Sequence, residues 1–168
     1  MLISATLSLG YGSVFTLLAE IRARFGFADW VIGAIGGAGF AAGFVAQAFL
    51  SRFADRGRLR ALMLGGLASA LVGLAGMIAA ERLWEFIAAR VLLGLGSGCF
   101  SPAVRRIAVT RDPARAGQTL GLMTTFELGG FLLGPVLASL LFELGGLRAP
   151  FVALAALLAV LTPLAVRA

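Results

Sequence analysis

The sequence is poor in the side chains from which most enzymes build their working sites. It has no histidine and a single cysteine, Cys99, so neither a metal cluster of those residues nor an internal disulfide can form. Only 13% of its 168 residues are charged, whereas a soluble domain has about 25%. No nucleophile–base set and no phosphate-binding loop is present in the sequence. The sequence therefore predicts no enzyme, no metal site and no cofactor.

The chain is rich in long apolar segments. Hydrophobic residues make up 60% of it, and its mean hydropathy is +1.00. They gather in six segments of about 17 to 25 residues, each long enough to cross a hydrocarbon core of about 30 Å. Because a backbone in lipid must satisfy its own hydrogen bonds, each segment is expected to be a helix. We predict an all-α integral membrane protein, one domain over residues 1–168, with transmembrane helices over residues 2–21, 30–50, 61–80, 84–104, 118–142 and 150–166.

The positive charges lie mostly at the ends of these segments. The net charge is +6, and every basic residue is an arginine. Anionic lipid headgroups are the natural partners of arginines placed in this way, so we expect no nucleic acid partner. Nine arginines fall on the side that holds the second and fourth connections and the C-terminus, and four fall on the opposite side. The excess predicts that both termini are cytoplasmic in a cell membrane protein.

Small residues recur at helical spacing in the second and fourth segments. Gly39 and Gly43 lie four residues apart, as do Gly94 and Gly98. Faces of this kind let two helix backbones approach closely in lipid, which predicts a packing role for these glycines. The alternative is that some of them line surfaces that slide past each other during a conformational change.

Two ionisable residues, Arg90 and Glu127, lie too deep in their segments to reach a helix end. Glu127 is about nine residues into its segment, or about 14 Å at 1.5 Å per residue. A charge at this depth costs about 2.5 to 3.5 kcal/mol and faces protein or water. We expect Arg90 and Glu127 to pair or to share a hydrated cavity. The alternative is that Glu127 is a neutral, hydrogen-bonded packing residue.

The face of the fifth segment that carries Glu127 has almost no side-chain bulk. Glu127, Gly130, Gly134 and Ala138 fall within about 60° of one another on a helix. Pro135 removes a backbone donor and bends or loosens the helix there. The face therefore predicts close contact with another helix, one that this chain does not obviously supply.

The connection SRFADRGRLR resembles the signature loop between helices two and three of the major facilitator superfamily of secondary transporters. Asp55 and Arg56 match its aspartate–arginine pair, and Arg60 matches a trailing basic position. Ser51 stands where glycine is usual, and Gly57 comes one residue early. The resemblance implies that this loop gates the inward opening, with Asp55 as the best candidate gating residue.

Two further motifs of the same family fall on the expected segments. Arg90 and Gly94 match an arginine followed four residues later by glycine, although Leu93 replaces the usual glutamine. The resemblance links that arginine to proton coupling. The segment FELGGFLLGPVLA is similar to the antiporter motif of helix five, and Gly130, Gly134 and Pro135 fit it. Ala138 replaces a glycine there. This motif is typical of drug:proton antiporters.

The resemblance implies the N-terminal six-helix half of such a transporter. Members have two halves with the substrate between them, so the implied partners are protons, a small-molecule substrate, the lipid bilayer, and either a C-terminal six-helix half or a second protomer. We expect a truncated chain, because the glycine face of the fifth segment otherwise lacks a helix to contact. The expected function is proton-coupled efflux of small amphipathic compounds by alternating access. The alternatives are uptake of sugars or organic acids, and a non-transporting membrane scaffold or assembly partner.

Overall fold

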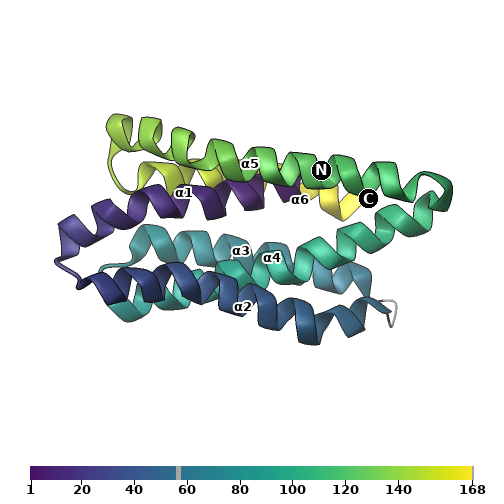
Figure 1. Ribbon diagram of the computed structural model, residues 1–168, viewed down its shortest axis with the longest axis horizontal. Helices are drawn as coiled ribbons and strands as arrows, with labels where there is room; N and C mark the ends of the chain where they lie inside the picture. Colours follow the sequence, from purple (N-terminus) through teal and green to yellow (C-terminus); the bar gives the residue numbers. More distant parts are fainter. Residues whose placement is uncertain (56–57, 168) are drawn as a thin grey trace.

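Six long helices make up the computed structural model, which describes residues 1–55 and 58–167 (Figure 1). Side chains are described for residues 1–49 and 58–163. The all-helical fold is the one predicted from hydropathy. The helices are α1 (Leu2–Phe25), α2 (Asp29–Asp55), α3 (Leu59–Ala79), α4 (Leu83–Arg111), α5 (Ala116–Gly145) and α6 (Ala149–Arg167), with a short 3₁₀ turn, η1 (Pro113–Arg115), before α5.

Most helices extend beyond the apolar segments that predicted them, although α3 ends at Ala79, one residue before the end of its segment. Hydropathy marks where the chain leaves the hydrocarbon, whereas a helix ends only where its backbone geometry is broken. The fourth segment was expected to end at Val104, but α4 runs to Arg111. Pro113 ends it, because a proline disfavours the helical conformation of the residue before it. Asp112 accordingly has φ −142° and ψ 83°, and its carboxylate accepts a hydrogen bond from the Arg115 N–H at 3.2 Å.

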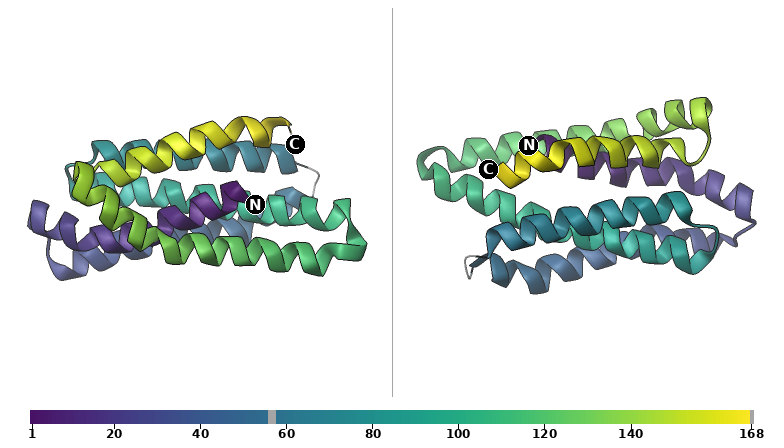
Figure 2. Two further views of the ribbon diagram at one scale, coloured as in Figure 1. Left: turned by 90° about the horizontal axis from the view of Figure 1, so that it is seen from above. Right: turned by 180° about the vertical axis from the view of Figure 1, so that it is seen from behind.

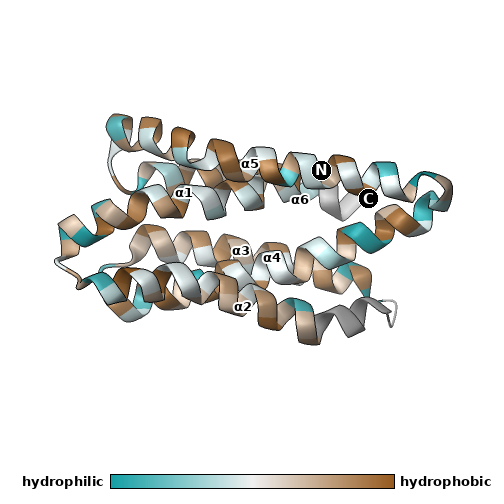
Figure 3. Ribbon diagram, in the orientation of Figure 1, coloured by the Kyte–Doolittle hydropathy of each residue, from teal (hydrophilic) through white to brown (hydrophobic). Residues whose placement is uncertain are grey.

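Five of the helices, α1 to α5, are long and apolar enough to span a membrane. The sixth, α6, contributes a shorter apolar part, Ala149–Pro163, within the described residues. Most of each ribbon is apolar, and hydrophilic residues gather toward the helix ends (Figure 3). The structure is thus that of a multi-pass helical membrane protein.

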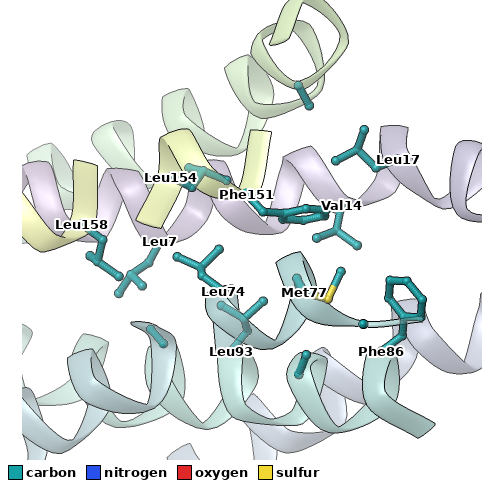
Figure 4. Close-up of a cluster of buried hydrophobic side chains, with 14 of the residues drawn as sticks. Leu7, Val14, Leu17, Leu74, Met77, Phe86, Leu93, Phe151, Leu154 and Leu158 are labelled. Carbon is teal, nitrogen blue, oxygen red and sulfur yellow. The ribbon is translucent and has the colours of Figure 1, made fainter. Parts of the chain in front are cut away.

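The helices lie side by side along the long axis of the molecule, α1, α5 and α6 in one group and α2, α3 and α4 in the other (Figures 1 and 2). Both chain ends point toward the end of the bundle that carries the α2–α3 and α4–α5 connections (Figure 2). Apolar side chains fill the space between α1 and α6 on one side and α3 and α4 on the other (Figure 4). Labelled members of this core are Leu7, Val14, Leu17, Leu74, Met77, Phe86, Leu93, Phe151, Leu154 and Leu158.

Glycines set the close contact between α2 and α4. A Cβ on Gly98 would lie 2.6 Å from the carbonyl oxygen of Gly43, and a Cβ on Gly94 would overlap the carbonyl oxygen of Gly39. Any side chain at these two positions of α4 would push the helices apart. Gly39, Gly43, Gly94 and Gly98 therefore lie together at one helix–helix contact, as small residues in membrane helices commonly do.

The glycine face of α5 contacts α1. A Cβ on Gly134 would lie 2.5 Å from the Leu9 carbonyl oxygen, and a Cβ on Gly130 would overlap the carbonyl oxygen of Ala5. The expectation that this chain lacks a helix for the face was wrong, because α1 covers it. Sequence spacing defines a face but does not say which of several apolar helices will pack on it.

Pro135 belongs to the same α1–α5 contact. It has no N–H, so the carbonyl of Phe131, four residues earlier, lacks its usual helical donor. That carbonyl lies directly against Gly12 of α1, where a Cβ would overlap it. Beside it, the Ser13 hydroxyl donates to the carbonyl oxygens of Leu9, at 2.8 Å, and Gly134, at 3.1 Å. The break in the α5 hydrogen-bond ladder is thus packed against a glycine of α1.

Candidate functional site

An open cavity of about 500 Å³ lies where the α1–α5 pair meets the α2–α4 pair. The glycine contacts hold each pair tight, but aromatic rings stand between the pairs. Phe15 of α1 lies 5.8 Å from Phe40 of α2 and 6.1 Å from Phe131 of α5, measured between ring centroids. The walls combine the rings of Phe40, Phe44 and Phe131 with a few polar groups. The lining residues are Leu7, Ser8, Tyr11, Phe40, Gly43, Phe44, Gln47, Ser97, Ser101, Glu127 and Phe131.

Glu127 is the acidic residue in the cavity wall. Its side chain is 15% exposed, and its Oε2 lies 2.5 Å from Nη2 of Arg105, which is 44% exposed. The other carboxylate oxygen, Oε1, is buried and has no hydrogen-bond partner among the described residues. The Glu127 carboxylate therefore faces protein and the cavity. It is paired with Arg105 of α4, whose side chain is the more exposed of the two.

The structure does not bring Arg90 and Glu127 together as the expected ion pair. Glu127 pairs with Arg105 instead, because α4 continues seven residues past Val104 and carries Arg105 up to α5. Arg90 also lies outside the cavity wall that contains Glu127, among the residues described. Tyr11 links their surroundings, because it lines the cavity and also contacts Arg90.

Arg90 is completely buried, with 0% exposure. Its Nε donates to the carbonyl of Ile35 and its Nη2 to that of Gly36, each at 3.3 Å. A Cβ on Gly39 would lie 2.9 Å from the guanidinium carbon, so this glycine makes room for the group. No acidic side chain of the described residues lies within 4.0 Å of it. Arg90 is thus a buried cation held by backbone carbonyls of α2.

Tyr11 of α1 is the second support of Arg90. Its ring centroid lies 5.1 Å from the guanidinium carbon, within the range of a cation–π contact. Its hydroxyl lies 2.9 Å from the Ser97 hydroxyl and donates to the Gly39 carbonyl at 3.3 Å. A Cβ on Gly43 would lie 3.5 Å from the Tyr11 oxygen, so the phenol oxygen packs in van der Waals contact with this part of α2.

Sequence reasoning missed Tyr11 and Arg105. Tyr11 is the only tyrosine of the chain, and a lone phenol within an apolar segment was the signal. Arg105 continues the small, polar stripe of α4 that starts at Arg90 and passes through Ser97 and Ser101. It lies about one helical turn after Ser101. Because the helix was expected to end at Val104, Arg105 was not placed on the same helix face.

The candidate gating residues lie at the end of α2, in the connection to α3 and at the start of α3. Arg56 lies outside the described residues, and Asp55 is the last residue of α2, with a side chain that is not described. Arg60 is exposed at the start of α3. A gating role for this loop stays a prediction. Within the described part of the chain, no three acidic or cysteine side chains gather closely enough to hold a metal ion.

Comparison with known proteins adds independent information. The family model described as Major Facilitator Superfamily matches residues 1–168. Similar curated proteins include the multidrug resistance protein MdtG of Dickeya zeae, 37% identical over 109 residues, which are 64% of this chain and 26% of the relative. The MdtG proteins of Yersinia enterocolitica and Citrobacter koseri are 36% identical over 120 residues and 37% identical over 118, covering 68% and 69% of this chain.

The matched region spans only a little over a quarter of the length of these relatives, 28% and 29% for the last two. The family match, in contrast, covers the chain from end to end. Together with the six apolar helices, it settles the class of protein. The chain belongs to the major facilitator superfamily of membrane transporters.

Proposed function

We propose that the protein exports small amphipathic compounds in exchange for protons. The observation that carries the proposal is Glu127, an intramembrane carboxylate in the wall of a cavity lined mainly by aromatic and aliphatic groups. Apolar walls with a few polar groups suit ligands that are largely apolar. An ionisable residue inside a membrane span is characteristic of proton and substrate pathways. The multidrug resistance names of the curated relatives support the same class of substrate.

In the proposed mechanism Glu127 exchanges its partner during the transport cycle. In the described state, the guanidinium of Arg105 on α4 pairs with one oxygen of the Glu127 carboxylate and balances its charge. A proton on the carboxyl would turn it into a donor and remove the charge that holds Arg105. Loss of the ion pair would release the C-terminal part of α4 from α5, and the two states would differ in their affinity for substrate. A ligand or proton shifts such an equilibrium only through this difference in affinity.

The cavity is proposed to be half of a substrate site. In this kind of transporter the site lies near the bilayer midplane between two repeats. The face that carries Phe40, Phe44 and Phe131 is open, so we propose that a second six-helix half or a second protomer closes it. The arginine bias and the common direction of the chain ends support an orientation with both termini in the cytoplasm.

The test is transport in proteoliposomes, with ethidium as the amphipathic probe and an imposed proton gradient. We expect ethidium movement that stops when an ionophore collapses the gradient. In Glu127→Gln we expect the proton dependence of the movement to disappear. Proton dependence equal to that of the unaltered protein in Glu127→Gln would contradict the mechanism.

The same vesicles separate the alternatives. Accumulation of a labelled sugar or organic acid, with no ethidium movement, would indicate an uptake transporter. Absence of any proton-linked flux, together with a stable complex with another membrane protein, would indicate a scaffold or assembly partner.

A further inference from the structure

The burial of Arg90 requires compensation that the hydrogen bonds only partly supply. A buried guanidinium is costly in a membrane unless it is paired, and no described acidic side chain lies within ion-pair distance of this one. Two carbonyls at 3.3 Å engage Nε and Nη2, whereas Nη1 has no partner among the described residues. The remaining compensation is the ring of Tyr11, whose electron-rich face lies 5.1 Å from the guanidinium carbon.

Tyr11 also stands between Arg90 and the open cavity. A small internal space of about 10 Å³ next to Arg90 is lined by Tyr11 and by apolar residues such as Leu74 and Leu154. Leu7 and Tyr11 belong to the walls of both this space and the large cavity, whereas Arg90 lines only the small one, and of the two shared residues Tyr11 makes the described contact with Arg90. The phenol therefore separates the buried cation from the place where a ligand would bind.

The position of the ring depends on groups in the cavity wall. The Tyr11 hydroxyl bonds with Ser97, and Ser97 itself lines the cavity. The ring also lies 5.3 Å from that of Phe40, another wall residue. A ligand that packs on Phe40 or hydrogen-bonds to Ser97 would compete with the contacts that hold Tyr11 over Arg90.

From these contacts we infer that Tyr11 is a positioning residue, which holds Arg90 against α2 and transmits occupancy of the cavity to it. The inference rests on the proposed function, because it takes the large cavity as the substrate site. The ring carries the contact with Arg90, and the hydroxyl sets where the ring lies. The two parts can be separated by substitution, since phenylalanine keeps the ring and leucine keeps only the apolar bulk.

The first test compares Tyr11→Phe and Tyr11→Leu in proteoliposomes, and measures protons moved per ethidium exported. In Tyr11→Phe we expect a changed KM for ethidium and an unchanged proton-to-ethidium ratio. In Tyr11→Leu we expect loss of the fixed ratio, with protons moving in the absence of ethidium, because the cation–π contact that holds Arg90 is gone. A merely structural role would lower the amount of active protein but would leave the ratio as it was.

Phe44→Leu is the matched control, because Phe44 lines the cavity and makes no ring or cation–π contact with Arg90 among those described. We expect it to alter the KM alone. A normal ratio in Tyr11→Leu, or an equal change of the ratio in Phe44→Leu, would overturn the inference. Absence of ethidium export by the unaltered protein would instead contradict the proposed function, and the inference would then be decided by the second test.

The second test does not need transport. Tyr11 is the only tyrosine of the chain, so fluorotyrosine labelling gives a single fluorine NMR resonance from this ring. Arg90→Met should move the resonance, and ethidium should shift it by a different amount in the unaltered protein than in Arg90→Met. Equal ethidium shifts in the two proteins would mean that ethidium only touches the ring, and no shift would mean that it does not reach the ring. Either result overturns the inference.

Discussion

The α1–α5 and α2–α4 contacts are built from the same small residues, yet they enclose different chemistry. In the α1–α5 contact, glycines bring the two backbones close together. Among the described residues, the only polar side-chain link between these helices is the Ser13 hydroxyl, which donates to the Gly134 carbonyl. In α2–α4, the same closeness gives a guanidinium, Arg90, access to two carbonyls of the facing helix. A glycine face thus fixes how near two helices lie, while a single larger residue at its edge decides what the contact can do.

The largest effect should come from filling either glycine contact. Gly134→Val on α5 would place side-chain atoms where Leu9 and Ser13 backbone atoms lie within 2.8 Å of a Cβ, and we expect a loss of about 3 kcal/mol in stability. Gly98→Val should cost about as much, because Gly43 and Ala46 crowd that position on α2. Thermal unfolding in detergent measures both.

Gly121→Val is the control for these substitutions. It lies on α5 with no atom within 4 Å of a Cβ, so it carries the helix-propensity change without the crowding. Similar losses in Gly121→Val and Gly134→Val would show that propensity, and not the contact with α1, explains the cost.

The second-largest effect on stability is expected from replacing Arg90, the residue that distinguishes the α2–α4 contact from the α1–α5 contact. Arg90→Met removes the cation and keeps much of the volume, and we expect stability to rise by about 1 kcal/mol, since a buried charge is often less stable than an apolar residue of similar size. Proton-coupled transport should be lost in the same variant. Arg90→Lys is the comparison variant, because it keeps the positive charge but lacks the planar guanidinium group that donates to two carbonyls. A large loss of stability in Arg90→Met would indicate that Arg90 holds the α2–α4 contact together.

A smaller effect on stability is expected from loss of the serine hydrogen bond in the α1–α5 contact. Ser13→Ala removes the hydroxyl that donates to Gly134, and interhelical hydrogen bonds in membranes average about 0.6 kcal/mol. The thermal midpoint should therefore fall slightly, and transport should persist. Thr6→Val is the comparison, because among the described residues the Thr6 hydroxyl bonds only within α1, to the Leu2 carbonyl at 2.9 Å. Loss of transport in Ser13→Ala alone would assign this contact a functional role as well.

The smallest effect on stability is expected at the partly exposed ion pair that joins the two helix pairs. Arg105→Gln breaks the contact with Glu127, and pairs of this kind contribute about 0 to 1 kcal/mol. The proton dependence of ethidium export should change nonetheless, because the resident cation of the carboxylate is gone. Arg111→Gln, on the same helix beyond the cavity, is the control for loss of one arginine. Unaltered proton dependence in Arg105→Gln would separate the ion pair from the transport cycle.

Particular residues show how far sequence reasoning reached toward the site. The depth of Arg90 and Glu127 in apolar segments was enough to single out both, since charge in lipid is costly wherever it falls. Their partners were not predictable in the same way. Arg105 reaches Glu127 because α4 continues beyond its apolar segment. Arg90 lies against α2, where Tyr11 contacts it, because Gly39 has no side chain to occupy the place of the guanidinium.

The class of fold and the number of helices follow from the sequence alone, because lipid forces backbone hydrogen bonds inside each apolar segment. The glycine faces of α2, α4 and α5 follow from helical spacing. The sequence also determined that two ionisable groups must lie within the protein. Only the tertiary structure decided that α1 covers the glycine face of α5, and that the two deep charges take separate partners. The physical reason is that hydropathy and helical period are properties of one helix, whereas a contact depends on the shapes of two.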